Sequence, residues 1–184
     1  MKKLLLILGV GAILVLGALF AIVSGLPDSF STSRSTEVDA SPAEAYAVAA
    51  DLHDWPEWTF WSRAGDPGAT WDFSGEAGAV GHSMKWKGDV WGEGQIVFTG
   101  CTPGERLDYE LTFWEDGEEM VSTGSIEFVP SSTGTAVTWT MSGQLEGLVA
   151  RAMGPLMDGV IGPMFETSLE GLATRLEGDG ATGG

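Results

Sequence analysis

The chain has 184 residues, of which 26 are acidic and 9 are basic, so its formal net charge at neutral pH is −17. A surface of that sign disfavours nucleic acid and anionic lipid headgroups as partners, because both are bound through clustered Lys and Arg side chains. The single cysteine, Cys101, excludes an internal disulfide, and the length suits one domain with one core.

The first 25 residues differ from the rest of the chain. Lys2 and Lys3 precede an uncharged, proline-free run from Leu4 to Val23. As a helix this run is about 30 Å long, which matches the hydrocarbon core of a bilayer. We therefore predict one N-terminal transmembrane helix in residues 1–25, with a cleaved signal peptide ending near Val23-Ser24-Gly25 as the alternative. A buried helix of a soluble protein is a third interpretation.

The charges around this run predict its orientation. Lys2 and Lys3 lie before it and no basic residue follows until Arg34, so the positive-inside rule leaves the N-terminus in the cytoplasm. The expected location is a single-pass membrane protein with its domain on the extracytoplasmic side, or a secreted protein if the signal is cleaved. Residues 26–32 are expected to form a linker, 33–178 the domain and 179–184 a disordered, glycine-rich tail.

A well-specified helix is predicted over residues 42–50. The Ser41 hydroxyl can accept a hydrogen bond from the first helical turn, and Pro42 suits the first helical position because its missing N–H has no helical partner to lose. Glu44 has the spacing of a capping box. Trp55 and Pro56 are expected to shape a turn shortly afterwards.

These residues also carry a family resemblance. Residues 38–44 (Val-Asp-Ala-Ser-Pro-Ala-Glu) and 51–58 (Asp-Leu-His-Asp-Trp-Pro-Glu-Trp) resemble the opening of the polyketide cyclase/dehydrase and lipid-transport branch of the START-like, or SRPBCC, superfamily. The resemblance implies an α+β helix-grip fold, in which a bent antiparallel sheet wraps round a long C-terminal helix and leaves an apolar cavity between them. Fold alone does not name the activity.

Period-two alternation predicts six to seven strands in an antiparallel meander. The clearest case is Leu107, Tyr109, Leu111 and Phe113, followed by the hairpin signal Asp116-Gly117. A two-residue loop there would place Phe113 opposite Met120 and Tyr109 opposite Gly124. Glycines within the strands would permit bulges and strong bending; they are Gly92, Gly94, Gly100, Gly124 and Gly143.

The last segment, residues 148–176, has the apolar spacing of a helix. Its two Gly-Pro pairs, at 154–155 and 162–163, predict a kink or break near residue 162, because a proline inside a helix removes a hydrogen bond and clashes with the preceding turn. The part before this point is rich in methionine, which adapts in shape, and would gate the cavity.

An apolar cavity is indicated by the eight tryptophans and the expected concave face. Any single tryptophan is more often part of a core than of a pocket wall. The candidate ligand-binding residues are Trp58, Trp61, Trp71, Trp86, Tyr109, Phe113, Trp139, Met157, Met164 and Phe165.

Catalytic and metal motifs are sparse. His53 and His82 are the only histidines, and no HExxH, CxxC or nucleophile elbow occurs, so no metal site and no cofactor is predicted. Tyr109, His82 and Arg63 are weak catalytic candidates, for proton transfer or charge stabilisation. The opposing interpretation of Tyr109 is a core tyrosine whose hydroxyl is satisfied by the protein.

Two functions from different classes follow. The first is a membrane-anchored module that binds a hydrophobic small molecule or lipid in the cavity. The alternative is a polyketide cyclase/dehydrase-like enzyme that acts on a cyclic or aromatic metabolite. A structural interaction domain with a filled cavity ranks third. Nucleic acid is not an expected partner, and no oligomeric state is specified.

Overall fold

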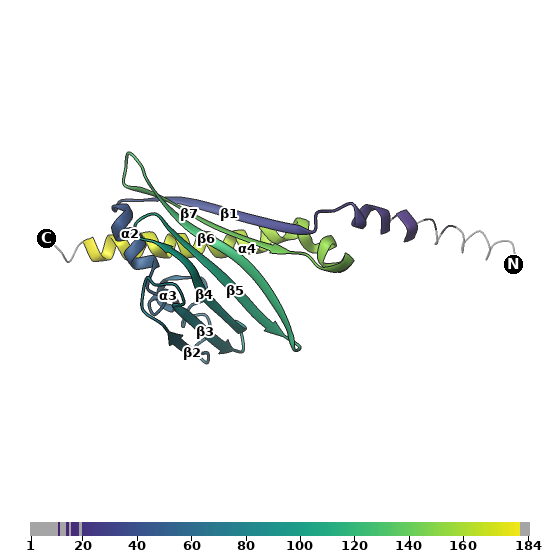
Figure 1. Cartoon of the computed structure of the whole chain (residues 1–184), viewed down its shortest axis with the longest axis horizontal. Helices are drawn as coiled ribbons and strands as arrows, with labels where there is room; N and C mark the ends of the chain where they lie inside the picture. The colour runs from purple at the N-terminus through teal and green to yellow at the C-terminus, as the bar shows by residue number, and fades with distance from the viewer. Residues whose placement is uncertain (1–10, 12–13, 15, 19, 181–184) are drawn as a thin grey trace, which may run out of the picture.

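The computed structural model describes residue 11, residue 14, residues 16–18 and residues 20–180 (Figure 1). Seven strands form one antiparallel sheet: β1 (Ser29–Val38), β2 (Thr70–Ser74), β3 (Ser83–Gly88), β4 (Gly92–Thr102), β5 (Arg106–Glu115), β6 (Glu118–Pro130) and β7 (Thr135–Gln144). The helices are α2 (Pro42–Ala49), α3 (Trp55–Trp58) and α4 (Gly147–Gly180). This arrangement confirms the predicted strand number and the sheet with a long C-terminal helix.

The sheet is a meander in which the first strand is added at one edge, beside the last strand. Its spatial order is β1-β7-β6-β5-β4-β3-β2, so β2 to β7 follow the chain while β1 pairs with the last strand. The sheet curves around α4, as Figure 1 shows, and α2 and α3 pack at one end of the same helix. The core lies between the concave face of the sheet and α4.

The start of α2 is built as predicted. Ser41 is the N-cap, its hydroxyl accepts from the Glu44 amide, and the Glu44 carboxylate accepts from the Ser41 amide in a complete capping box. Ala45 and Ala49 are fully buried, and their small side chains let α2 lie close to its neighbours.

The predicted β5–β6 register is also confirmed. Phe113 pairs with Met120, and Tyr109 pairs with Gly124. Asp116 and Gly117 both have positive φ, at 51° and 85°, as a two-residue hairpin turn with a right-handed strand twist requires. A Cβ at Gly124 would overlap the Tyr109 ring, so the glycine provides the space that this ring fills.

Two expectations about the ends of the domain need correction. Residues 29–32, placed in the linker, belong to β1 and pair with residues 141–144 of β7. The start of the strand was assigned to the linker because its serines and threonines lack a strong apolar alternation. The helix α4 is continuous through Pro155 and Pro163, so a break near residue 162, one of the two predicted alternatives, is wrong. Burial of Ile161, Phe165 and Leu169 against the sheet stabilises the helix on both sides of Pro163.

The predicted N-terminal anchor is not supported. Helical residues occur at 11, 14, 16–18 and 20–24, whereas residues 1–10, 12, 13, 15 and 19 of the predicted transmembrane helix lie outside the described residues. In the part of the chain that the structure describes, no helix is both long enough and apolar enough to cross a bilayer. This finding corrects the predicted single-pass membrane location. Of the predicted tail, residues 181–184 also lie outside the described residues.

Candidate functional site

Aromatic rings converge on the concave face of the sheet, around one small internal cavity. Its volume is about 10 Å³, and only apolar atoms face it. That space is about the minimum that one water molecule needs, and an apolar void of this size stays dry. The lining residues are Trp55, Trp61, Met84, Trp86, Ile96, Tyr109, Leu111 and Trp139.

Trp139 on β7 is the centre of this aromatic cluster. Its ring stacks on Phe165 of α4 with a centroid distance of 5.2 Å, and it meets Trp55 edge-on at 5.1 Å. Trp58 and Tyr109 lie 6.3 and 6.4 Å away. Offset-stacked and edge-to-face arrangements of this kind are the favoured geometries of aromatic pairs. Trp139 therefore joins the sheet, α3 and α4 through one side chain.

Tyr109 is buried with its hydroxyl satisfied by the protein. The hydroxyl donates to the Thr140 carbonyl at 3.2 Å and accepts from the Trp139 indole N–H at 2.8 Å. Burial raises the pKa of Tyr109 well above its ordinary value, so the phenol stays neutral at physiological pH. In this state it is a hydrogen-bond donor and not a base.

Trp61 is the one tryptophan of the cavity wall that is only partly buried, and it lies in the segment after α3. Short hydrogen bonds hold the two ends of this segment. The Thr59 hydroxyl donates to the Trp55 carbonyl, the Phe60 amide donates to the Ser168 hydroxyl, and the Arg63 amide donates to the Pro56 carbonyl. Trp61 lies between these attachment points and is the wall element with most access to solvent.

The other predicted ligand-binding residues surround this cavity without facing it. Phe113 meets Trp86 edge-on at 5.5 Å, and Trp71 lies 6.3 Å from Trp86 on the other side. Trp58 is buried, and its indole N–H has no hydrogen-bond partner. Met157 and Met164 are partly buried on α4, and Phe165 is fully buried there. The structure thus brings Trp61, Trp86, Tyr109 and Trp139 to the cavity and places the remainder behind or beside it.

His82 lies away from the cavity in a cluster with Asp51 and His53. It is fully buried, its Nε2 accepts from the Leu52 amide at 3.0 Å, and its Nδ1 lies 3.1 Å from the Ser74 carbonyl. Its two ring nitrogens thus join the residue before β3 to the segment after α2, through Leu52, and to the end of β2, through Ser74. The His53 Nδ1 lies 2.7 Å from Asp51 Oδ1, so His53 is paired with Asp51.

Arg63 lies at the surface and is already paired. Its Nε donates to Glu57 Oε1 at 2.9 Å, and its guanidinium lies 5.6 Å from the Trp71 ring centroid. The three weak catalytic candidates are therefore not brought together: Tyr109 alone lines the cavity.

Sequence reasoning missed four lining residues: Trp55, Met84, Ile96 and Leu111. Three of them lie two positions from another inward-facing residue of the same strand, since Met84 precedes Trp86, Ile96 precedes Phe98 and Leu111 follows Tyr109. Period-two alternation puts these residues on the inward face of the sheet. Their apolar side chains are typical of a hydrophobic core, however, and do not by themselves indicate a ligand site. Trp55 had been assigned to a turn, whereas its indole N–H donates to the Ala49 carbonyl and fixes the ring inward.

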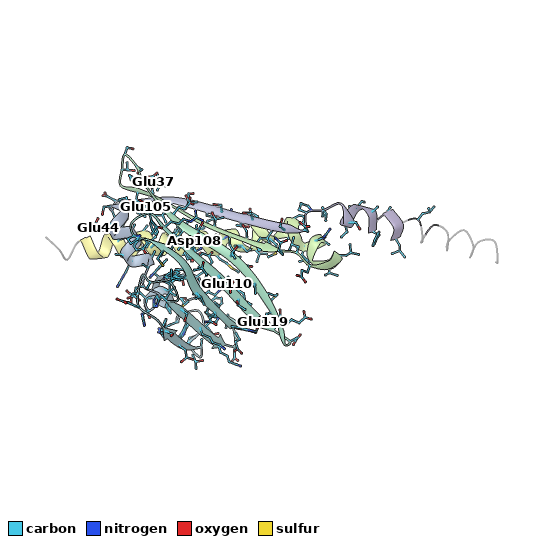
Figure 2. The ribbon with its side chains drawn as sticks, viewed as in Figure 1. Glu37, Glu44, Glu105, Asp108, Glu110 and Glu119 are labelled. Carbon is cyan, nitrogen blue, oxygen red and sulfur yellow. The ribbon has the colours of Figure 1, made fainter. Side chains whose placement is uncertain are left out.

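The acidic side chains lie outside this site. Figure 2 labels Glu37, Glu44, Glu105, Asp108, Glu110 and Glu119, which come from β1, α2, the β4–β5 turn, β5 and β6, with Asp108 and Glu110 both on β5. The five glutamates are exposed and Asp108 is half-buried. Their scattered distribution is typical of a solubilising surface.

The curved sheet, the helix that it encloses and the aromatic interior define a protein of the helix-grip class. Residues 29–177 match the family model described as polyketide cyclase/dehydrase and lipid transport. The chain belongs to this family, as its sequence resemblance suggested.

Solved structures show the same fold. Protein CV1439 from Chromobacterium violaceum is 18% identical with a TM-score of 0.57, over 83% of this chain and 99% of that one. The di-domain ARO/CYC StfQ from the steffimycin biosynthetic pathway is 14% identical with a TM-score of 0.63, over 84% of this chain and 52% of that one. The di-domain ARO/CYC BexL from the BE-7585A pathway is 15% identical with a TM-score of 0.62, over 86% and 53%. This chain spans about half of each di-domain protein. Comparison with curated proteins finds no match.

Proposed function

We propose that this protein encloses a cyclic or aromatic metabolite between its sheet and α4, and acts on it in the manner of a cyclase or dehydrase. The observation that carries the proposal is the convergence of five aromatic residues on one apolar cavity: Trp55, Trp61, Trp86, Tyr109 and Trp139. Family membership and the fold shared with two ARO/CYC proteins support it. Binding without turnover, of a hydrophobic molecule or lipid, is the second candidate.

The aromatic walls favour a flat ring over a flexible acyl chain. Rigid rings can stack on or meet the edges of indoles, and such pairs contribute about 0.5–1.5 kcal/mol beyond area burial. An acyl chain gains only the burial of its surface and loses more conformational freedom. A planar metabolite therefore makes better use of this set of side chains.

Ligand entry requires the site to open, because the cavity holds about 10 Å³ and drug-sized ligands occupy pockets of about 300–1,000 Å³. Trp61 is the wall residue placed to move, since its side chain is only partly buried whereas the other lining residues are buried. Met84 on the opposite wall adapts in shape when the ring enters.

The Trp61 movement gives a kinetic prediction. In Trp61→Ala, dissociation of a planar probe such as an anthraquinone is expected to accelerate about tenfold, because the wall that closes behind the ring is missing. Stopped-flow quenching of tryptophan fluorescence measures both rates. Trp114→Ala is the matched control: Trp114 is half-buried, bonds to Glu119 and does not line the cavity. Equal exchange rates in both variants, or an anthraquinone that quenches neither, would count against a ring-binding cavity.

Tyr109 distinguishes the two proposed functions, an enzyme and a binding module. It carries the only hydroxyl among the lining residues. That hydroxyl does not face the closed cavity, so a ketone oxygen receives its hydrogen bond only after the site opens and the bond to the Thr140 carbonyl is exchanged. That bond stabilises the negative charge that develops on the oxygen when the adjacent carbon loses its proton. Solvent water takes this proton, because no lining side chain is a base. The β-hydroxyl leaves as hydroxide and is neutralised by the released proton, so one water molecule is lost, and enolisation of the ring gives a phenol.

In Tyr109→Phe, conversion of a β-hydroxytetralone to the corresponding naphthol is expected to fall by about 10²–10³ in kcat, since one oxyanion donor is lost. Binding of the anthraquinone probe should stay within about twofold. Ultraviolet absorbance follows the naphthol, and fluorescence follows binding. If the native protein binds the ring but produces no naphthol above the uncatalysed rate, the binding module replaces the enzyme.

A further inference from the structure

A second cavity, of about 250 Å³, lies between the start of β1, the end of β7 and the first half of α4. In Figure 1 this is the end of the molecule where the chain enters β1. We call it the outer pocket. It shares no lining residue with the aromatic cavity. The residues around it are Pro27, Ser29, Phe30, Ser31, Thr32, Leu145, Arg151, Gly154, Pro155 and Asp158.

One side of the outer pocket is apolar. Phe30, Leu145 and Pro155 supply this surface, and two glycines make room for them. A Cβ at Gly143 would touch the Phe30 ring, and a Cβ at Gly154 would touch the Leu145 methyl group. The close approach of these side chains to the backbone leaves a smooth apolar surface for the body of a small molecule.

Thr32 supplies a buried hydroxyl that lies near the Asp158 carboxylate and, among the described residues, makes no hydrogen bond of good geometry. Its residue is 1% exposed, it lines the outer pocket, and its hydroxyl makes no hydrogen bond of acceptable geometry. A buried polar atom left unpaired costs about 1–3 kcal/mol. The hydroxyl can therefore exchange its weak contact with Asp158 for a better acceptor that enters the pocket.

Arg151 supplies a cation whose donors are nearly unused. Its closest carboxylate contact is to Asp28, at 3.8 Å, which is too long for a hydrogen bond. The side chain is one-third exposed, so its charge is accessible from the pocket without being fully hydrated. Its planar guanidinium is suited to a carboxylate, which it can bind through two parallel hydrogen bonds.

Asp158, the remaining charged residue of the outer pocket, is already paired. Arg34 donates to both of its oxygens, at 2.9 and 3.1 Å, and also to Glu166 at 2.7 Å. The hydrogen bonds from Arg34 hold the pKa of Asp158 below its usual range, and the nearby Thr32 hydroxyl adds a smaller effect. The groups of the outer pocket that remain for a ligand are therefore hydrogen-bond donors, on Arg151 and Thr32.

We infer that the outer pocket is a binding site for a short amphipathic carboxylic acid. Its carboxylate would accept hydrogen bonds from Arg151 and Thr32, and its apolar body would cover Phe30, Leu145 and Pro155. The volume is below the range of drug-sized ligands, so the acid is short or partly exposed. This site is independent of the aromatic cavity and of what that cavity binds.

Octanoate and its uncharged isostere octanamide test the site by isothermal titration of the full chain, at 0.15 M salt to screen the surface acids. Arg151→Gln is expected to weaken octanoate by about tenfold, as loss of a charged hydrogen-bond partner predicts, and to leave octanamide unchanged. Thr32→Val should weaken both ligands while stabilising the free protein, since the unpaired hydroxyl is removed.

Two control variants locate the effect. Arg106→Gln removes an equal charge from the exposed ion pairs with Asp108 and Glu127, and should leave octanoate binding unchanged. Trp61→Ala opens the aromatic cavity and should also have no effect. The assignment would be overturned if octanoate did not bind at millimolar concentration. It would also be overturned if Arg151→Gln left octanoate binding unchanged, or if Trp61→Ala changed it.

Discussion

Replacing Trp139 with alanine is expected to lower the free energy of unfolding by about 3–5 kcal/mol, at the upper range of large-to-small core substitutions. Trp139 is 1% exposed and contacts rings from α3, β5 and α4. Its loss also removes the indole N–H that bonds to the Tyr109 hydroxyl. Urea unfolding followed by circular dichroism measures the change.

The hole left by Trp139→Ala provides an internal check. An apolar cavity of indole shape should bind free indole, which would raise the stability by about 2.7 kcal/mol at one hundred times the dissociation constant. Trp114→Ala, on the half-buried position that bonds to Glu119, is the control and should cost about 1 kcal/mol with no response to indole. A loss equal to that of the control would mean that Trp139 does not organise the core.

Gly171 on α4 is expected to tolerate no side chain. A Cβ there would overlap the Trp58 carbonyl oxygen, which is backbone and cannot turn aside. Gly171→Ala should therefore destabilise the protein by about 3 kcal/mol, at the upper end of overpacking effects, by pushing α3 away from α4. The urea midpoint reports this change.

Gly159→Ala makes the same substitution in the same helix with the opposite expected sign. No atom of the described residues lies within 4 Å of a Cβ at Gly159. Alanine should stabilise this position by about 0.5–1 kcal/mol, because glycine loses more backbone entropy in a helix. If both substitutions changed the free energy of unfolding in the same direction, helix propensity and not the contact with Trp58 would determine the effect at Gly171.

Features that depend on neighbours in sequence could be predicted. The capping box of Ser41 and Glu44 uses three consecutive peptide units, and the Asp116-Gly117 turn fixes the pairing of Tyr109 with Gly124. Because a two-residue turn allows one register, local chemistry there determines contacts across the hairpin.

Features that depend on distant packing could not be predicted. The sequence shows Pro163 but not the burial of Phe165 and Leu169 that keeps α4 continuous around it. It likewise shows many tryptophans but not that the Trp86 ring fills the space beside Gly94, which reduces the cavity to about 10 Å³. The polar strand β1 is recognisable only through its pairing with β7.

The pairing of β1 with β7 also constrains when the protein can fold. Ser29 pairs with Gln144, so the first strand of the domain has no partner until the last strand has been made. Closing so long a segment is slow, because its entropy is lost before the contacts form. During synthesis β1 therefore stays unpaired. Its hydrogen bonds to β7 and its ion pairs with α4 are expected to form only once nearly the whole domain has left the ribosome.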